Sequence, residues 1–144
     1  MNELIQMLDG SGSDAEWGAA FKLRDLLGER LPELLLAHYK GAKKWKVRSS
    51  CVYHAVRYAK LSEAAISLAL LALHDKSKVV RYRACMLLAW SQKSEVLKEL
   101  HGELEKVPED SKPDLLAAID AIKSNNANYF VDRDHSGLTT LNIR

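Results

Sequence analysis

The residues with the clearest chemical potential are the basic side chains of the segment 40–83. This segment holds 11 lysines and arginines and two acids, whereas the segments before and after it are acidic overall, so the net charge of +2 hides a polarised chain. A basic band can bind nucleic-acid phosphates with release of counterions, or it can steer an acidic protein surface into register. It can also be a solvated face whose arginines form ion pairs within the chain.

Basic side chains of this band and two aromatic neighbours are the first candidates for partner contact. Trp45 stands among lysines, where an aromatic side chain can anchor an interface. Tyr53, Tyr82 and Trp45 itself also offer rings for stacking on a base. The predicted contact residues of this part are Lys43, Lys44, Trp45, Arg48, Tyr53 and Arg57.

The acidic C-terminal part supplies the second group of candidates. Glu99 and Glu103 belong to a run of glutamates that should give a neighbouring surface the opposite charge. Further along, a polar turn is expected to present an exposed tip, and exposed loop tips often carry recognition residues. The predicted tip residues are Asp132, Arg133, Asp134 and His135.

The same turn contains a partial metal-binding pattern. The sequence Asp132-x-Asp134-x-Ser136-Gly137 matches the first half of an EF-hand loop. The twelfth position of such a loop needs a bidentate carboxylate, and here it is Ile143. We therefore expect a turn in which the Asp and Ser side chains bond the local backbone, and we predict no metal and no cofactor.

Catalytic and targeting patterns are missing from the sequence. The five histidines are scattered, and there is no metalloprotease, Cys-x-x-Cys, phosphate-loop or nucleophile-elbow motif. We therefore predict that the chain is not an enzyme. Cys51 and Cys85 fall on expected core faces, as buried thiols do in a reducing compartment. With no signal-peptide pattern at the start and no apolar stretch long enough to span a bilayer, a cytoplasmic protein is expected.

The elements that must position these residues form a tandem repeat. The segments 45–59 and 77–91 place apolar or small residues three and four apart, which is typical of one helix face. Val47-Arg48 and Val80-Arg81 are 33 residues apart. A second helical pattern follows each copy, so the spacing indicates stacked helix pairs that bury their apolar faces against one another. Asp75, before the second copy, is expected to reach Arg81 or the free amides of the helix start.

With these residues, the sequence resembles the HEAT-like helical repeats. The second copy has the D-x4-V-R-x2-A-x3-L pattern of that family in Asp75, Val80, Arg81, Ala84 and Leu88. The first copy keeps Val47, Arg48 and Ala55 and has Ala42 in place of the Asp. The resemblance implies an α-α superhelical stack, and such stacks serve many binding roles.

The whole chain is expected to be one all-α domain with a small C-terminal β-hairpin. Ser13 and Glu16 form a predicted capping box for the helix that follows Ser13. The predicted parts are a degenerate helical cap over 1–41, two repeats over 42–107, a last helix over 111–124 and a hairpin over 128–144. The hairpin is expected from the aromatic and β-branched runs around the polar turn, and it should dock on the helices because a lone hairpin is marginal in water.

A non-catalytic protein-binding role is the function that these features favour. In size and style the chain is similar to immunity proteins of contact-dependent or other polymorphic toxin systems, and this resemblance implies binding to a cognate toxin domain and inhibition of it. A nucleic-acid-binding repeat protein that uses the basic band is the alternative, and a scaffold or adaptor is a third. No membrane association is expected.

Overall fold

The computed structural model describes residues 2–144, and within this range it is helical and contains no strand. The first three helices are α1 (Asn2–Gln6), α2 (Asp14–Leu27) and α3 (Leu31–Gly41). The remaining helices are α4 (Trp45–Ala55), α5 (Glu63–Ala72), α6 (Lys78–Ser91), α7 (Leu97–Glu103) and α8 (Lys112–Lys123). Short 3₁₀ turns at Gly28–Arg30, Val56–Tyr58, Ser94–Val96, Glu109–Ser111 and Ala127–Phe130 connect or extend them. The all-α prediction is confirmed.

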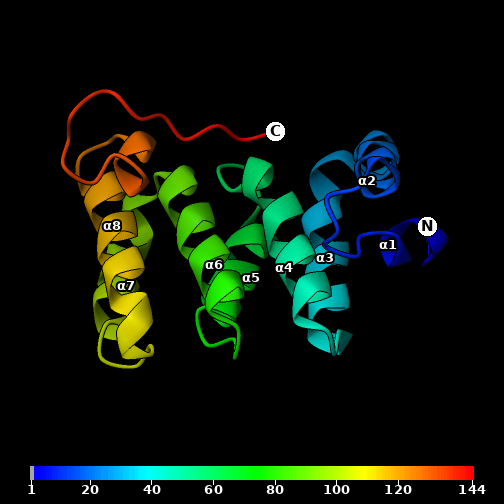
Figure 1. The fold of residues 1–144 in the computed structure, drawn as a ribbon, viewed down its shortest axis with the longest axis horizontal. Helices are drawn as coiled ribbons and strands as arrows, with labels where there is room; N and C mark the ends of the chain where they lie inside the picture. The colour runs from blue at the N-terminus through cyan, green and yellow to red at the C-terminus, as the bar shows by residue number, and fades with distance from the viewer. Residues whose placement is uncertain (1) are drawn as a thin grey trace.

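The helices are arranged in two layers (Figure 1). Helices α4, α6 and α8 pack side by side in sequence order, and α3 and α5 pack against each other behind them. Each front helix also contacts the rear helix that precedes it in the chain, so α3 pairs with α4, α5 with α6 and α7 with α8. No helix in residues 2–144 has the length and hydropathy to cross a membrane.

Serine caps determine where several of these helices begin. The hydroxyl of Ser77 accepts a hydrogen bond from the amide of Val80, and Ser62 caps α5 in the same way. Ser13 caps α2 by accepting from the amide of Glu16. The predicted capping box is only half formed, because the Glu16 carboxylate accepts from the amide of Gly12 and otherwise faces α4.

Small and apolar residues at helical spacing form the core between the layers. Val80, Ala84 and Leu88 of α6 are completely buried, and so are Cys51 and Ala55 of α4. These five residues lie on the faces that the repeat pattern predicted. Alanine and cysteine at these positions let the helix backbones approach closely, which explains why α4 and α6 pack along their length.

One arginine joins the loop before α4 to the loop before α6. Nη1 of Arg48 donates to the carbonyls of Ala42 and Lys43 at 3.4 and 2.8 Å. Its Nε and Nη2 donate to the Asp75 carboxylate at 2.8 and 3.1 Å. The hydroxyl of Tyr39 donates to the same buried carboxylate. The guanidinium therefore bridges its own loop and the next one.

Arg81 of α6 makes the corresponding set of contacts one helix pair further along. Its Nη1 donates to the carbonyls of Asp75 and Lys76 at 2.7 and 3.1 Å. Its Nη2 donates to Asp110 at 3.1 Å and its Nε to the hydroxyl of Ser111 at 2.6 Å. Three successive loops on one edge of the molecule are thus connected by two arginine bridges.

These bridges correct the expected role of Asp75. The Asp75 carboxylate pairs with Arg48 of α4 and accepts a hydrogen bond from the amide of Ser77. Arg81 contacts only the backbone carbonyl of Asp75. Ala42 serves the first bridge equally well, because a carbonyl is all that the arginine needs there. Burial alone raises the pKa of the Asp75 carboxyl, but the hydrogen bonds from Arg48, Tyr39 and Ser77 outweigh it, and the pKa lies below its ordinary value.

The predicted C-terminal hairpin is wrong. Residues 128–144 contain no strand, and the chain after the turn runs extended across the ends of the helices towards the N-terminal half (Figure 1). The amide of Leu141 donates to the side chain of Asn128, and Leu141 and Ile143 pack on the core. The preference of such residues for strands reflects their fit to a half-buried surface, and here the helices provide that surface. The Tyr129–Val131 run, expected as the first strand, lies at the 3₁₀ turn with Phe130 completely buried.

The Asp75→Ala variant should lose about 3–5 kcal/mol of unfolding free energy, because it leaves the largely buried Arg48 guanidinium without its counter-charge. Urea unfolding measures this loss. Glu109→Ala, which breaks the exposed pair with Lys112, is the control, and since the Glu109 side chain is 87% exposed it should cost about 1 kcal/mol or less. Equal losses in the two variants would contradict the assignment of the Arg48–Asp75 bridge as the principal link.

Both thiols should be unreactive in the folded protein. Burial raises the pKa of Cys51 and of Cys85 to about 12, so neither is a thiolate near neutral pH. Ellman's reagent should modify them about 10³-fold more slowly than in urea-unfolded protein, in proportion to the rare unfolded population. Rapid modification of either cysteine in native buffer would show that its helix face is open.

Candidate functional site

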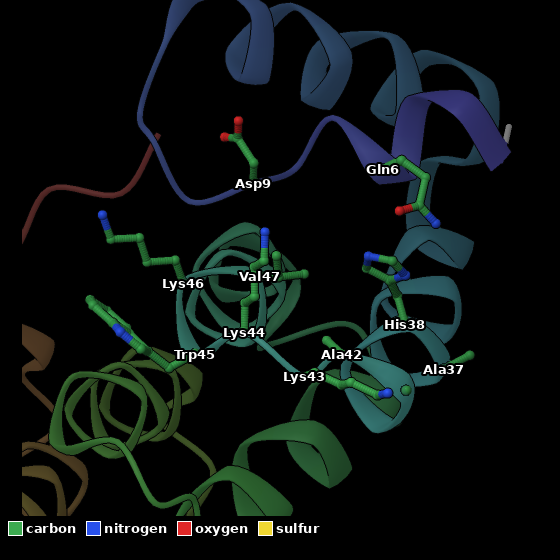
Figure 2. Close-up of a pocket in the computed structure, with 11 residues that line it drawn as sticks. Gln6, Asp9, Ala37, His38, Ala42, Lys43, Lys44, Trp45, Lys46 and Val47 are labelled. Atoms are coloured by element: carbon green, nitrogen blue, oxygen red, sulfur yellow. The ribbon is translucent and has the colours of Figure 1, made fainter.

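A hollow of about 910 Å³ lies where α3 ends and α4 begins. Figure 2 shows Lys43 and Lys44 from the connecting loop, Trp45 and Lys46 from the first turn of α4, and His38 from α3 around it. Asp9, from the loop after α1, lines the same hollow. The structure therefore brings together three of the residues that the sequence predicted for partner contact.

A second hollow, of about 650 Å³, adjoins the first and shares Ala42 and Lys43 with it. Its lining includes Lys40 at the end of α3 and Lys76 in the loop before α6. We call the exposed cations of the two hollows the lysine edge, and none of them forms an ion pair within residues 2–144. The lysine edge consists of Lys40, Lys43, Lys44, Lys46 and Lys76.

Trp45 is the large aromatic side chain of the lysine edge. It is 43% exposed, although a tryptophan is usually well buried in a folded domain. The ammonium of Lys46 lies 5.8 Å from the centre of its ring. A half-exposed indole among cations beside a hollow has the character of an interface anchor.

Three predicted basic and aromatic contact residues lie outside the lysine edge. Arg48 is occupied by its bridge to Asp75. Tyr53 packs edge-on against Trp17, inside the fold. Arg57, in the 3₁₀ turn that follows α4, donates to the carbonyl of Arg144. The basic band of the sequence is thus divided between bridges, the lysine edge and the opposite end of the helices.

The predicted acidic residues lie beside the lysine edge. Glu103 of α7 approaches His74 in the α5–α6 loop, with 2.6 Å between Oε2 and Nε2. Glu99, on the same helix, is exposed. Of the two predicted acids, Glu103 has a side chain only 13% exposed and is taken up by His74, so Glu99 alone is open to a partner.

The predicted tip at residues 132–135 is not one exposed recognition point. Asp132 is buried, and its carboxylate accepts from the amides of Ser136 and Gly137, so the local turn is confirmed and Asp132 is unavailable to a partner. Its pKa is lowered, first by the Ser136 hydroxyl. The other tip residues are exposed, but two of them bind helix α8: Arg133 contacts Asp114 at 2.9 Å and His135 contacts Asp120 at 2.6 Å. Asp134 is exposed.

A buried polar cluster that the sequence did not predict lies between α2 and α4. Oε2 of Glu16 accepts from the hydroxyl of Ser50 at 2.5 Å and lies 3.1 Å from Nε2 of His54. Burial alone raises the pKa of the Glu16 carboxyl. The hydrogen bonds from Ser50, Gly12 and His54 have the larger, opposite effect, so the pKa lies below its ordinary value. The sequence feature that could have predicted the cluster is the four-residue spacing of Ser50 and His54. This spacing places both residues on one helix face next to Cys51 and Ala55.

The His54 imidazole should stay neutral in the folded protein. Burial lowers its pKa below the ordinary value of 6.5, against the opposing effect of Glu16. The unfolded chain takes up a proton as the pH falls through 6.5 and the folded chain does not, so the unfolding free energy should decrease by up to about 1.4 kcal/mol per pH unit below that point. Urea titrations between pH 7.5 and 5.5 measure the slope. His54→Gln should lose it and the exposed-site control His101→Gln should keep it; a native His54 that titrates above 6.5 by NMR would contradict this.

Comparison with known proteins identifies no relative of this chain. No protein-family model matches the chain, and no curated protein matches it. The chemistry of the lysine edge and of the buried cluster is therefore inferred from their own residues and geometry.

Proposed function

We propose that this chain is a non-catalytic protein-binding module whose lysine edge binds an acidic surface of a partner protein. The observation that carries the proposal is the set of five exposed lysines without ion pairs around two adjoining hollows. Such a set repels itself and gains most from a surface of opposite charge, which it attracts over a Debye length of about 8–10 Å. Trp45 would supply the apolar contact that carries much of the affinity.

The rigidity of the lysine edge supports this function. The loops that carry Lys43, Lys44 and Lys76 are held by the bridges of Arg48 and Arg81. A surface held in place before binding loses less conformational entropy when a partner docks. The exposed carboxylate of Glu99 on α7 would add register, because a partner with the reverse charge pattern docks in one orientation.

Protein is favoured over nucleic acid by the nearby arginines and by two of the three rings that could stack on a base; the third, Trp45, is exposed and suits either kind of partner. Tyr53 packs beside Trp17, and Tyr82 packs on Phe130, so neither ring is free to stack on a base. The arginines nearest the edge are used in bridges, which leaves lysine as the exposed cation and removes the forked geometry that suits phosphate.

We further propose that the fold is a HEAT-like stack and that the partner is a toxin domain inhibited in the cytoplasm. The matching contacts of Arg48 and Arg81 with successive loops support the stack. The resemblance in size and style to immunity proteins supports the inhibitory role, and a surface divided between positive and negative charge suits tight recognition of one cognate partner.

Charge reversal at the lysine edge should weaken partner binding. The double variant Lys43→Glu/Lys44→Glu should weaken the complex at least about tenfold, because each exposed ion pair contributes up to about 1 kcal/mol and the reversed charges repel the acidic partner. Affinity purification from nuclease-treated lysate, followed by titration of the identified protein, measures the effect. Lys22→Glu, an exposed lysine of α2 outside the hollows, is the matched control.

The same preparation tests the alternative. Binding to random duplex DNA or RNA that weakens steeply with salt and disappears in the double variant would contradict the proposal and favour a nucleic-acid partner. Unchanged affinity of the purified protein partner for the double variant would place the interface elsewhere.

A further inference from the structure

A third hollow, separate from the lysine edge, is lined by arginine. It has a volume of about 290 Å³ and lies where α2, α4, α6 and the C-terminal residue meet. We call it the arginine hollow, and its lining includes Glu16, Trp17, Tyr53, His54, Arg83 and Arg144. A volume near the lower end of the range for ligand sites suits a small molecule or ion.

Aromatic rings hold the two guanidinium groups of the arginine hollow. The guanidinium carbon of Arg83 lies 4.5 Å from the centre of the Tyr53 ring, and that of Arg144 lies 4.3 Å from the Trp17 ring. Neither arginine forms an ion pair within residues 2–144. A guanidinium against a ring face keeps the N–H groups on its rim available, which is the arrangement that recognises oxyanions.

Neighbouring charges make the arginine hollow more positive. Arg24 of α2 lies over Trp17, 5.7 Å from the ring centre, and has no carboxylate partner in residues 2–144. Burial lowers its pKa, and so does repulsion from Arg57 and Arg144. The Glu16 carboxylate is already bonded by Gly12, Ser50 and His54, and it offsets one positive charge only. Like charges gathered at one hollow are stabilised when an anion enters.

His54 requires a hydrogen-bond donor on any ligand that contacts its Nδ1. It is 2% exposed, and its Nδ1 has no hydrogen-bond partner among the described residues. Because Nε2 faces the Glu16 carboxylate, which accepts a proton, Nδ1 carries the lone pair and needs a donor. A ligand that fits the hollow therefore combines oxyanion oxygens for the arginines with a hydroxyl for His54.

We propose that the arginine hollow binds a phosphate group, either as hydrogen phosphate or at the end of a small monoester. Its unprotonated oxygens accept from Arg83 and Arg144, and its P–OH donates to Nδ1 of His54. Sulfate has the same shape and no proton at neutral pH, so it lacks the last bond. The site is independent of the proposed function, because no residue of the lysine edge lines it.

Calorimetric titration and thermal unfolding of the full chain test the proposal. Phosphate should bind at least about fivefold more tightly than sulfate at equal ionic strength. At a concentration about 100 times its Kd it should raise the unfolding midpoint by about 5 °C or more, whereas sodium chloride should not. Glycerol phosphate, titrated in parallel, shows whether the monoester or the free ion binds more tightly.

Variants locate the bound phosphate. Arg83→Gln and Arg144→Gln should each weaken phosphate binding at least about tenfold, as expected for loss of a charge-assisted hydrogen bond. Arg30→Gln, an exposed arginine outside the hollow, is the matched control, and Lys43→Glu/Lys44→Glu should also bind phosphate normally. Arg144→Gln changes an exposed residue and should keep the fold even if Arg83→Gln does not. Equal effects of phosphate, sulfate and chloride, or full affinity in Arg144→Gln, would overturn the proposal.

Discussion

The pairing of one guanidinium with two successive loops is the constraint on which the rest of the structure depends. Arg48 and Arg81 each contact carbonyls of their own loop and an acid of the next. Backbone carbonyls that would otherwise be unpaired at helix termini are satisfied in this way. Three successive loops on one edge are consequently connected to one another through two guanidinium groups.

This constraint also decides which cations reach solvent. Arginines near the loop edge are used internally, so the surface there presents lysine, a compact charge suited to long-range attraction. At the other hollow the arrangement is reversed, because Arg83 and Arg144 lie on aromatic rings and keep their donors free. One small chain thus separates two kinds of positive surface, a broad one with the character of a docking area and a narrow one with the character of a ligand site.

Local features were predictable from the sequence and long-range pairings were not. The cap at Ser77 and the buried helix faces follow from hydrogen bonding and periodicity within a few residues. Asp75 was expected to bind Arg81 or the free amides of the helix start; it does accept from the Ser77 amide, but its ion pair is with Arg48, 27 residues away. The tail was expected to pair with itself because β propensity carries no information about which surface is nearby. The lysine edge was partly predicted; the contacts of Arg144 with the first half of the chain have no sequence signal.

The returning tail limits how this architecture can change in length. It starts beyond α8 and reaches the ring of Trp17 in α2, so it spans the front layer from one end to the other (Figure 1). In an open array a helix pair can be gained or lost with effects only on its neighbours. Here the duplication of a helix pair would move Arg144 away from the ring of Trp17. The deletion of a helix pair would leave the tail longer than the distance it has to span. The length of the last fourteen residues therefore fits the present number of helices in the front layer.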